Sequence, residues 1–256
     1  MTRALLSLLV LCACAPAQAQ DNAADRIAER DLREFTAMLP GTYTNEEQVY
    51  FHGELDRPEA TALPRLTLTI VPDGDGFVAR TESPSGRTTE ARLSYRAEDG
   101  AIRSREVREG QPDCERVFTR HFETFRGEGC GAPVIASPEG FVFGPAANPF
   151  VMHRARPFTC WVSPRKPDGS YGFRPGLRLH DQGGRSWVEG EDFERVGIKM
   201  RRVRWPAGRN RDSLVLYAYR GADEDGAVSY AWTGPDSDRI ALNLRWMQAS
   251  CTLDAD

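Results

Sequence analysis

The chain has 256 residues, long enough for one large domain or two small ones, and 40% of its residues are hydrophobic. That hydrophobic content can furnish a packed core, which excludes an intrinsically disordered protein. Acidic residues outnumber basic residues by 37 to 33, giving a net charge of −4, and the isoelectric point is about 5.7. This charge balance argues against a general nucleic-acid binder.

Residues 1–19 have the layout of a secretory signal peptide. Arg3 provides the positive charge, residues 4–13 an apolar segment, and residues 17–19 an A-x-A cleavage site. We therefore expect a periplasmic or secreted protein. A lipoprotein is the alternative, because residues 11–14 approximate a lipobox in which Cys14 would carry a lipid anchor. No other stretch approaches the ~18 unbroken apolar residues of a membrane-spanning helix, so none is expected.

Four cysteines remain after removal of the signal peptide. They are Cys114, Cys130, Cys160 and Cys251. An even number of cysteines in an oxidising compartment predicts two disulfides, and four cysteines can pair in three ways.

The first predicted element is an amphipathic helix over residues 25–39. Its apolar positions follow helical spacing: Ile27, Leu32, Phe35 and Leu39. Pro40-Gly41 should end the helix, and the chain should then continue as a strand through Tyr43, Val49 and Phe51. We expect this helix to pack on, or to plug, a β-barrel.

The rest of the chain is predicted to be β-structure, because short apolar runs alternate with turns rich in Gly, Pro and Asp. The expected strands are residues 65–71, 77–79, 88–95, 102–107, 115–122, 141–144, 158–162, 171–179, 187–193, 196–205, 213–219, 228–232 and 240–247. So many short strands with one helix predict an all-β fold, either an antiparallel barrel or a sandwich. We favour the β-barrel, because a closed barrel leaves no exposed strand edge. Since no linker divides the chain, a single domain is expected over residues 20–256.

Standard catalytic motifs do not fit this chain. Residues 163–166 match S-x-x-K, but Pro164 and Pro167 place them in a turn instead of a helix. The four histidines are scattered, with no pair at metal-ligand spacing, so no metal site is expected. Catalytic residues therefore stay unassigned.

The most basic stretch runs from Arg195 to Arg211 and contains no acid. Its early apolar residues share one face of a strand, whereas Val203 and Trp205 take the opposite parity, which predicts a β-bulge near residues 201–202. Arginine offers paired donors to anions, so the run could bind a propionate, a phosphate or an acidic glycan. The alternative is a solvated strand face balanced by nearby acids. Those acids are Glu189, Glu191, Asp192 and Glu194.

Large aromatic residues are distributed over many of the predicted strands. They are Tyr43, Tyr50, Phe51, Trp161, Tyr171, Trp187, Trp205, Trp232 and Trp246. In a barrel such side chains either fill the interior or form a wall on which a flat ligand stacks.

Three segments resemble the CpcT/CpeT family of chromophore lyases. The first carries Leu39, Gly41, Tyr43, Asn45 and Gln48. The second is Gly129-Cys130 followed by Phe141-Val142-Phe143-Gly144 and Cys160. The third is a D-x-G-x-x-x-W segment over residues 181–187, and residues 102–105 are a counterpart of the family's Tyr-Arg-x-Arg segment.

The resemblance implies a calycin-like barrel with one N-terminal helix. Family members attach a linear tetrapyrrole to a cysteine of an acceptor protein, which needs an apolar slot, cations for two propionates and a proton donor or acceptor. A linear tetrapyrrole is thus a candidate ligand, and an acceptor protein a candidate partner. The resemblance also implies a Cys130–Cys160 disulfide, which leaves Cys114–Cys251 as the second.

Together these patterns give seven candidate ligand-binding residues. They are Tyr43, Gln48, Arg103, Arg105, Trp161, Trp187 and Arg202. The predicted function is an exported barrel that binds a small hydrophobic or anionic ligand. The alternatives are a bilin lyase or chaperone, which Arg103 and Arg105 in a pocket beside Trp161 or Trp187 would favour, and an envelope structural protein with a filled barrel.

Overall fold

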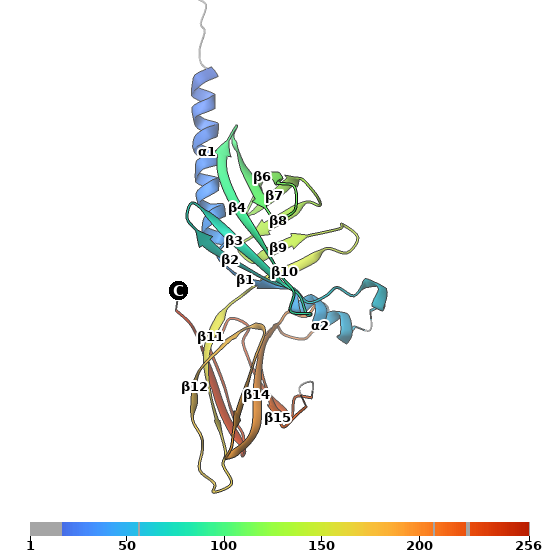
Figure 1. Cartoon of the computed structure of the whole chain (residues 1–256), viewed down its shortest axis with the longest axis vertical. Helices are drawn as coiled ribbons and strands as arrows, with labels where there is room; N and C mark the ends of the chain where they lie inside the picture. The colour runs from blue at the N-terminus through green and yellow to red at the C-terminus, as the bar shows by residue number, and fades with distance from the viewer. Residues whose placement is uncertain (1–16, 56, 207, 224–225, 256) are drawn as a thin grey trace, which may run out of the picture.

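A computed structural model describes residues 17–55, 57–206, 208–223 and 226–255 (Figure 1). Most of the expected signal peptide, and the candidate lipid anchor Cys14, lie outside the described residues. None of the described helices is long and apolar enough to cross a membrane.

In the described part of the chain, ten antiparallel strands close into a barrel. They are β1 (Gly41–Thr44), β2 (Thr67–Asp73), β3 (Gly76–Glu82), β4 (Thr88–Glu98), β5 (Ala101–Val107), β6 (Cys114–His121), β7 (Thr124–Gly129), β8 (Val134–Ser137), β9 (Gly140–Phe143) and β10 (Phe150–Ala155). Strand β1 closes the barrel by pairing with both β2 and β10. The predicted all-β fold with an antiparallel barrel is confirmed.

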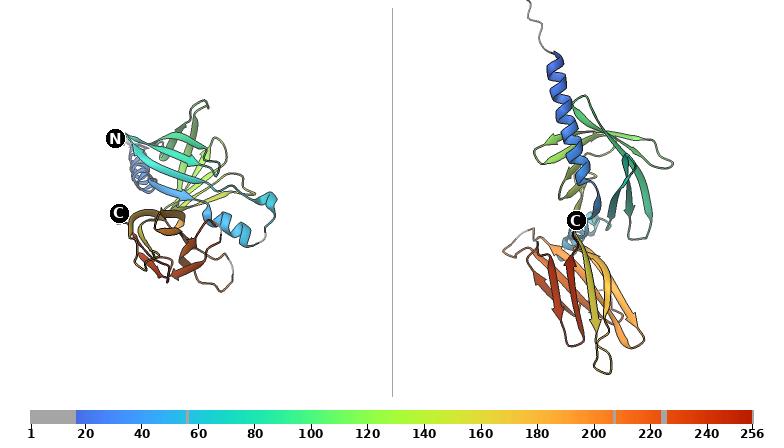
Figure 2. Two further views of the ribbon diagram at one scale, coloured as in Figure 1. Left: turned by 60° about the horizontal axis from the view of Figure 1, so that its bottom comes forward. Right: turned by 90° about the vertical axis from the view of Figure 1, so that its left-hand side faces the viewer.

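Helix α1 (Ala17–Met38) contributes to the barrel core, and its N-terminal end projects beyond the strands (Figures 1 and 2). The Phe35 ring is buried, with its centroid 4.8–5.1 Å from the rings of Tyr95, Phe118 and Phe125. The Tyr43 ring contacts Phe141 at 4.7 Å. Aromatic side chains therefore pack against one another inside the barrel.

Helix α1 ends before Pro40, as predicted, but the following strand is shorter than expected. Strand β1 stops at Thr44, and helix α2 (Glu46–Glu54) replaces the predicted strand through Val49 and Phe51. The Thr44 hydroxyl accepts the backbone N–H of Glu46, and the Val49 N–H donates to the Asn45 carbonyl to begin the helical ladder. Two acidic residues in the first turn also favour a helix, since they face the positive end of its dipole.

The strands described after the barrel form two four-stranded sheets, ordered β12-β11-β18-β17 and β13-β14-β15-β16. They are β11 (Pro157–Pro164), β12 (Arg174–His180), β13 (Gln182–Gly190), β14 (Phe193–Val203), β15 (Ser213–Arg220), β16 (Ser229–Thr233), β17 (Arg239–Asn243) and β18 (Met247–Leu253). Residues from both sheets share one apolar core, so the two sheets form a sandwich.

The barrel thus occupies only part of the range 20–256, whereas the sequence predicts a single barrel over that range. Strand β10 already pairs with β1, so the barrel has no free edge for later strands to join. Strand β11 follows β10 after one residue and instead pairs with β12 and β18.

The bulge predicted near residues 201–202 lies instead in the neighbouring strand β13. Strand β14 pairs with β15 without interruption from Val196 to Val203, whereas β13 shifts register between Gln182 and Arg185. The apolar residues of β14 change from one face to the other for a different reason. Val203 packs on Phe51 of helix α2, so apolar residues are buried on both faces of β14.

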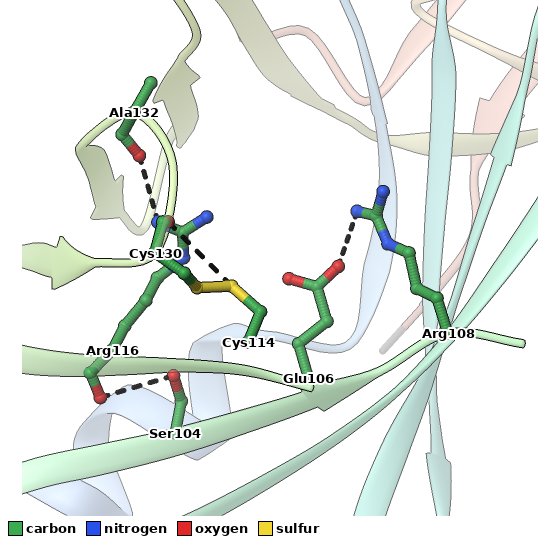
Figure 3. The surroundings of a disulfide bond; sticks show 7 residues. All are labelled: Ser104, Glu106, Arg108, Cys114, Arg116, Cys130 and Ala132. Atoms are coloured by element: carbon green, nitrogen blue, oxygen red, sulfur yellow. Dashed lines mark hydrogen bonds and ion pairs between the residues drawn. A yellow bond between two sulfur atoms is a disulfide. The ribbon is translucent and has the colours of Figure 1, made fainter. Parts of the chain in front are cut away.

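Both disulfide pairings implied by the resemblance are wrong. The described residues contain Cys114–Cys130 and Cys160–Cys251. Strands β6 and β7 form a hairpin that brings Cys114 beside Cys130 (Figure 3), and Cys160 lies directly opposite Cys251 in the β11–β18 pair. Strand register therefore decides the pairing.

Candidate anion-binding cleft

Glu46, the first residue of α2, carries a buried carboxylate at the junction of barrel and sandwich. Its side chain is 1% exposed; Oε1 accepts from Lys199 Nζ at 2.9 Å and from an Arg201 guanidinium nitrogen at 2.7 Å. Arg65 Nε lies 2.5 Å from the other oxygen, Oε2. Because a buried charge costs several kcal/mol unless it is paired, these three cations are what permit a carboxylate here.

Gly183, at the β13 bulge, makes room for the Glu46 side chain. A Cβ on Gly183 would lie 2.6 Å from the Glu46 carboxyl carbon, and the residue has φ +86°, which favours glycine. The D-x-G segment of the sequence therefore has a steric role: its glycine lets α2 approach the second sheet.

Burial and charge shift the pKa values of this cluster. Burial alone would raise the pKa of Glu46, but the charges of Lys199, Arg201 and Arg65 and the Lys199 hydrogen bond together hold it below its ordinary value. For Lys199, burial outweighs the attraction of Glu46, and the Arg201 charge acts with burial, so its pKa is lowered.

An open cleft of about 710 Å³ lies beside this cluster, between α2 and the second sheet. Its polar and aromatic lining residues are Tyr50, Glu54, Arg65, Arg185, Lys199, Arg201, Tyr217 and Tyr219. Cations outnumber carboxylates among these residues, and the buried Glu46 offsets only part of the positive charge. The cleft therefore offers an anion several donors beside tyrosine rings.

Arg201 is held in place by aromatic rings as well as by Glu46. Its guanidinium carbon lies 4.0 Å from the ring centre of Tyr50 and 5.7 Å from that of Tyr217. Its Nε has no hydrogen-bond partner among the described residues. The guanidinium is thus fixed in position at the wall of the cleft.

A second buried pair, Glu47 and His153, fixes the other side of α2. The Glu47 carboxylate accepts the backbone N–H of Arg204, and His153 Nε2 lies 3.3 Å from Glu47 Oε2. Burial and the charges of Arg204 and Arg202 lower the pKa of His153 to about 4, although the charge of Glu139 acts in the opposite direction. Burial also raises the pKa of Glu47. At neutral pH a neutral imidazole can therefore donate its Nε2 proton to Glu47.

Two of the sequence-predicted ligand residues hold the barrel together. Tyr43 is fully buried; its hydroxyl donates to a backbone carbonyl of α1 or the residue after it, and accepts from Arg154 at 2.9 Å. Gln48 donates its Nε2 to the Pro149 carbonyl at 2.8 Å and accepts the Val151 N–H. Both side chains make contacts within the protein that explain their presence without a ligand.

Arg103 and Arg105 lie on the outer face of the barrel. They alternate along β5 with the buried residues Ile102 and Ser104, which face the interior. Arg103 pairs with Glu98 at 2.7 Å, and Arg105 pairs with Asp113. Neither arginine lies in the part of the molecule that holds Trp161 and Trp187.

The remaining predicted residues are spread over the sandwich. Trp161 packs against Phe173, with ring centres 5.7 Å apart, whereas Trp187 belongs to the other sheet and lies 3.9 Å under the Arg195 guanidinium. Arg202 pairs with Asp236 at 2.5 Å. The structure therefore does not bring the seven predicted residues into one site.

The residues that do converge were only partly signalled by the sequence. Lys199 and Arg201 belong to the basic run, and Tyr50 was among the aromatics, but Glu46 and Arg65 were not singled out. The signal for Glu46 was the acidic pair after Asn45, which marks a helix start. In the described residues, no three His, Cys, Asp or Glu side chains are grouped so that they could hold a metal ion.

Comparison with known protein families, curated proteins and solved structures finds no match for this chain.

Proposed function

We propose that this protein binds a small anionic ligand in the cleft between α2 and the second sheet. The observation that supports the proposal best is that Lys199 and Arg201 line an open cleft while Glu46 and Tyr50 hold them in position. Groups that are already ordered lose little freedom on binding, so such a site favours a ligand. The ligand would carry a carboxylate or phosphate and an apolar part that packs on Tyr217.

We place this activity in the periplasm or outside the cell. The support is the pattern of residues 1–19 and the two disulfides of the described chain, which form and persist in oxidising compartments. The support for membership of the CpcT/CpeT family is the sequence resemblance alone.

The alternatives draw on different observations. The packed aromatic core of the barrel favours an envelope structural protein over a barrel that holds a hydrophobic ligand inside. Attachment of a linear tetrapyrrole to an acceptor cysteine rests on the resemblance, and the outward-facing Arg103 and Arg105 do not add to it.

Thermal unfolding in the presence of anions tests the proposal. Inorganic phosphate, citrate and galacturonate would each be added to the mature protein at constant ionic strength. A ligand that binds only the folded state raises Tm with increasing concentration. We expect at least one of these anions to raise Tm more than sodium chloride does.

A matched pair of variants locates the site. Arg65 is half-exposed at the cleft, whereas Arg87 is exposed in the turn between β3 and β4. Arg65→Gln should reduce the Tm increase and Arg87→Gln should preserve it. The proposal fails if no anion acts beyond the effect of salt, or if the two variants respond alike. A sharpened, red-shifted absorbance band on titration with biliverdin would support the tetrapyrrole alternative instead.

A further inference from the structure

The outer face of the second sheet continues the chemistry of the cleft. Strand register aligns Arg185, Lys199, Tyr217 and Tyr230 in one row across β13, β14, β15 and β16. Residues directly opposite each other on neighbouring strands share a face, so all four side chains leave the sheet on the same side. The cations are at one end of this row and the tyrosines at the other.

This face is opposite the sandwich core. The residues that alternate with the row along β14 and β15 point to the other side of the sheet. Ile198, Leu216 and Ala218 are examples, and they are fully buried in that core. Helix α2 covers the part of the outer face around Val203 and Val215. Glu46 of α2 also pairs with Lys199, whose side chain is only 6% exposed, and Tyr217 packs beside the cluster of Phe51, Val203 and Val215. The other end of the row, at Tyr230, is exposed.

Two large aromatic side chains are exposed at the end of the row. Tyr230 is 65% exposed and Trp232 is 69% exposed. They are two residues apart on β16 and therefore share a face at a spacing of roughly 7 Å. The Tyr217 ring lies 6.3 Å from the Tyr230 ring, so the aromatic surface is continuous with the cleft. Exposed aromatic patches of this kind mark binding surfaces.

We propose that this face binds an acidic polysaccharide, with a uronate carboxylate in the cleft and the following sugars on Tyr217, Tyr230 and Trp232. The inference rests on the proposed anion-binding function and names its ligand class. Arginine pairs well with carboxylates. The apolar faces of pyranose rings stack on aromatic rings while their hydroxyl groups remain in water, which suits exposed tyrosine and tryptophan side chains.

The length of the row favours a chain over a single sugar. Four neighbouring strands span about 14 Å, since adjacent strands are about 4.8 Å apart. One sugar in the cleft would leave Tyr230 and Trp232 without a contact. Single-stranded nucleic acid also uses cations and stacking aromatics, but the net charge of −4 disfavours a polyanion as dense as that.

Titration of the mature full-length protein tests the inference. Binding of polygalacturonate, galacturonate and neutral dextran would be measured by calorimetry at one ionic strength, with polymer concentrations expressed per sugar unit. We expect polygalacturonate to bind at least tenfold more tightly than galacturonate, and dextran not to bind. Trp232→Ala and Tyr230→Ala should each weaken polymer binding by about tenfold, as loss of one stacking contact does, and should leave galacturonate binding unchanged.

Phe173→Ala provides the matched control, because Phe173 is 57% exposed and precedes β12 in the other sheet. This variant should bind the polymer like the parent protein. The polysaccharide inference fails, while the proposed function stands, if galacturonate binds but polygalacturonate binds no more tightly per sugar unit. It also fails if Trp232→Ala leaves polymer affinity unchanged. If galacturonate, phosphate and citrate all fail to bind, the proposed function itself fails.

Two further results would overturn the inference in favour of other partners. Tighter binding of a single-stranded oligonucleotide than of polygalacturonate would indicate a nucleic-acid surface. Concentration-dependent dimers that Trp232→Ala abolishes, without polymer binding, would assign the exposed aromatics to contact with a second copy of the chain.

Discussion

Glu46 Oε1 and Lys199 Nζ lie 2.9 Å apart, with side chains only 1% and 6% exposed. One belongs to the helix that follows the first barrel strand, and the other to the middle of β14 in the sandwich. The ion pair therefore joins the two halves of the molecule, and it also positions a lysine that lines the cleft.

Glu46→Gln should destabilise the protein strongly. The substitution leaves Lys199 and Arg201 buried without a counter-charge, and breaking a buried pair in this way costs about 3–5 kcal/mol. The free energy of unfolding from urea titration measures the change. Glu54→Gln, near the exposed end of the same helix, should change it by less than about 0.5 kcal/mol.

Replacing both partners separates the charge effect from loss of packing. Glu46→Gln combined with Lys199→Met should recover part of the lost stability, because an apolar side chain needs no counter-charge. If Glu46→Gln alone is no worse than Glu54→Gln, the Glu46 cluster does not hold the barrel and sandwich together.

Local patterns in the sequence predict most of the elements but not their long-range partners. Alternation and turn residues locate many of the strands but miss β7, β8 and β10. Pro40-Gly41 marks the end of the first helix. The barrel closes through pairing of residues 42–44 with residues 153–155, which no local pattern encodes. The disulfides likewise follow the register of β11 with β18 and the β6–β7 hairpin.

The candidate cleft could likewise be predicted only in part from local sequence patterns. The basic run predicts that Lys199 and Arg201 could form an anion site, but their counter-charge Glu46 lies far away in the sequence. Alternation along β14 also changes because α2 covers one end of its outer face, and the position of α2 depends on tertiary packing. A tertiary cause of this kind is easily mistaken for a local bulge.

Gly183→Ala should destabilise the protein more than Gly86→Ala does. Both glycines have positive φ, +86° and +75°, so both substitutions carry a similar backbone penalty. Only at Gly183 would the new Cβ meet Glu46, whereas nothing lies within 4 Å of it at Gly86. We expect a further loss of about 1–3 kcal/mol at Gly183, as for overpacking elsewhere, measured by urea unfolding. Equal losses would show that Glu46 can move aside freely.

His153 should make stability depend on pH between about 6.5 and 4. Its pKa is about 4 in the folded protein, because of burial and the Arg204 charge, and near 6.5 when unfolded. In that window the unfolded chain binds the proton more readily, so stability falls as pH falls, by at most about 1.4 kcal/mol per pH unit. The raised pKa of Glu47 acts in the opposite direction, since the folded state then takes up a proton first.

His153→Gln isolates this contribution. The free energy of unfolding would be measured from pH 7.5 to pH 4 for both proteins. The parent should lose more stability than the variant between pH 6.5 and pH 4, and the two curves should run nearly parallel at the upper end of the range, near pH 7.5. Parallel curves over the whole range would mean that His153 is protonated as easily in the folded state as in the unfolded state.

The two disulfides should contribute unequally to stability. Cys160–Cys251 closes a loop with a sequence separation of 91 and Cys114–Cys130 one of 16, which corresponds to about 4.6 and about 3 kcal/mol in the chain-entropy account. Replacing Cys160 and Cys251 by alanine should therefore lower the free energy of unfolding more than replacing the other pair. Peptide mapping of the oxidised protein checks the pairing itself. A peptide that links Cys130 to Cys160 would contradict the register of β11 with β18, and with it the separation of the barrel from the sandwich.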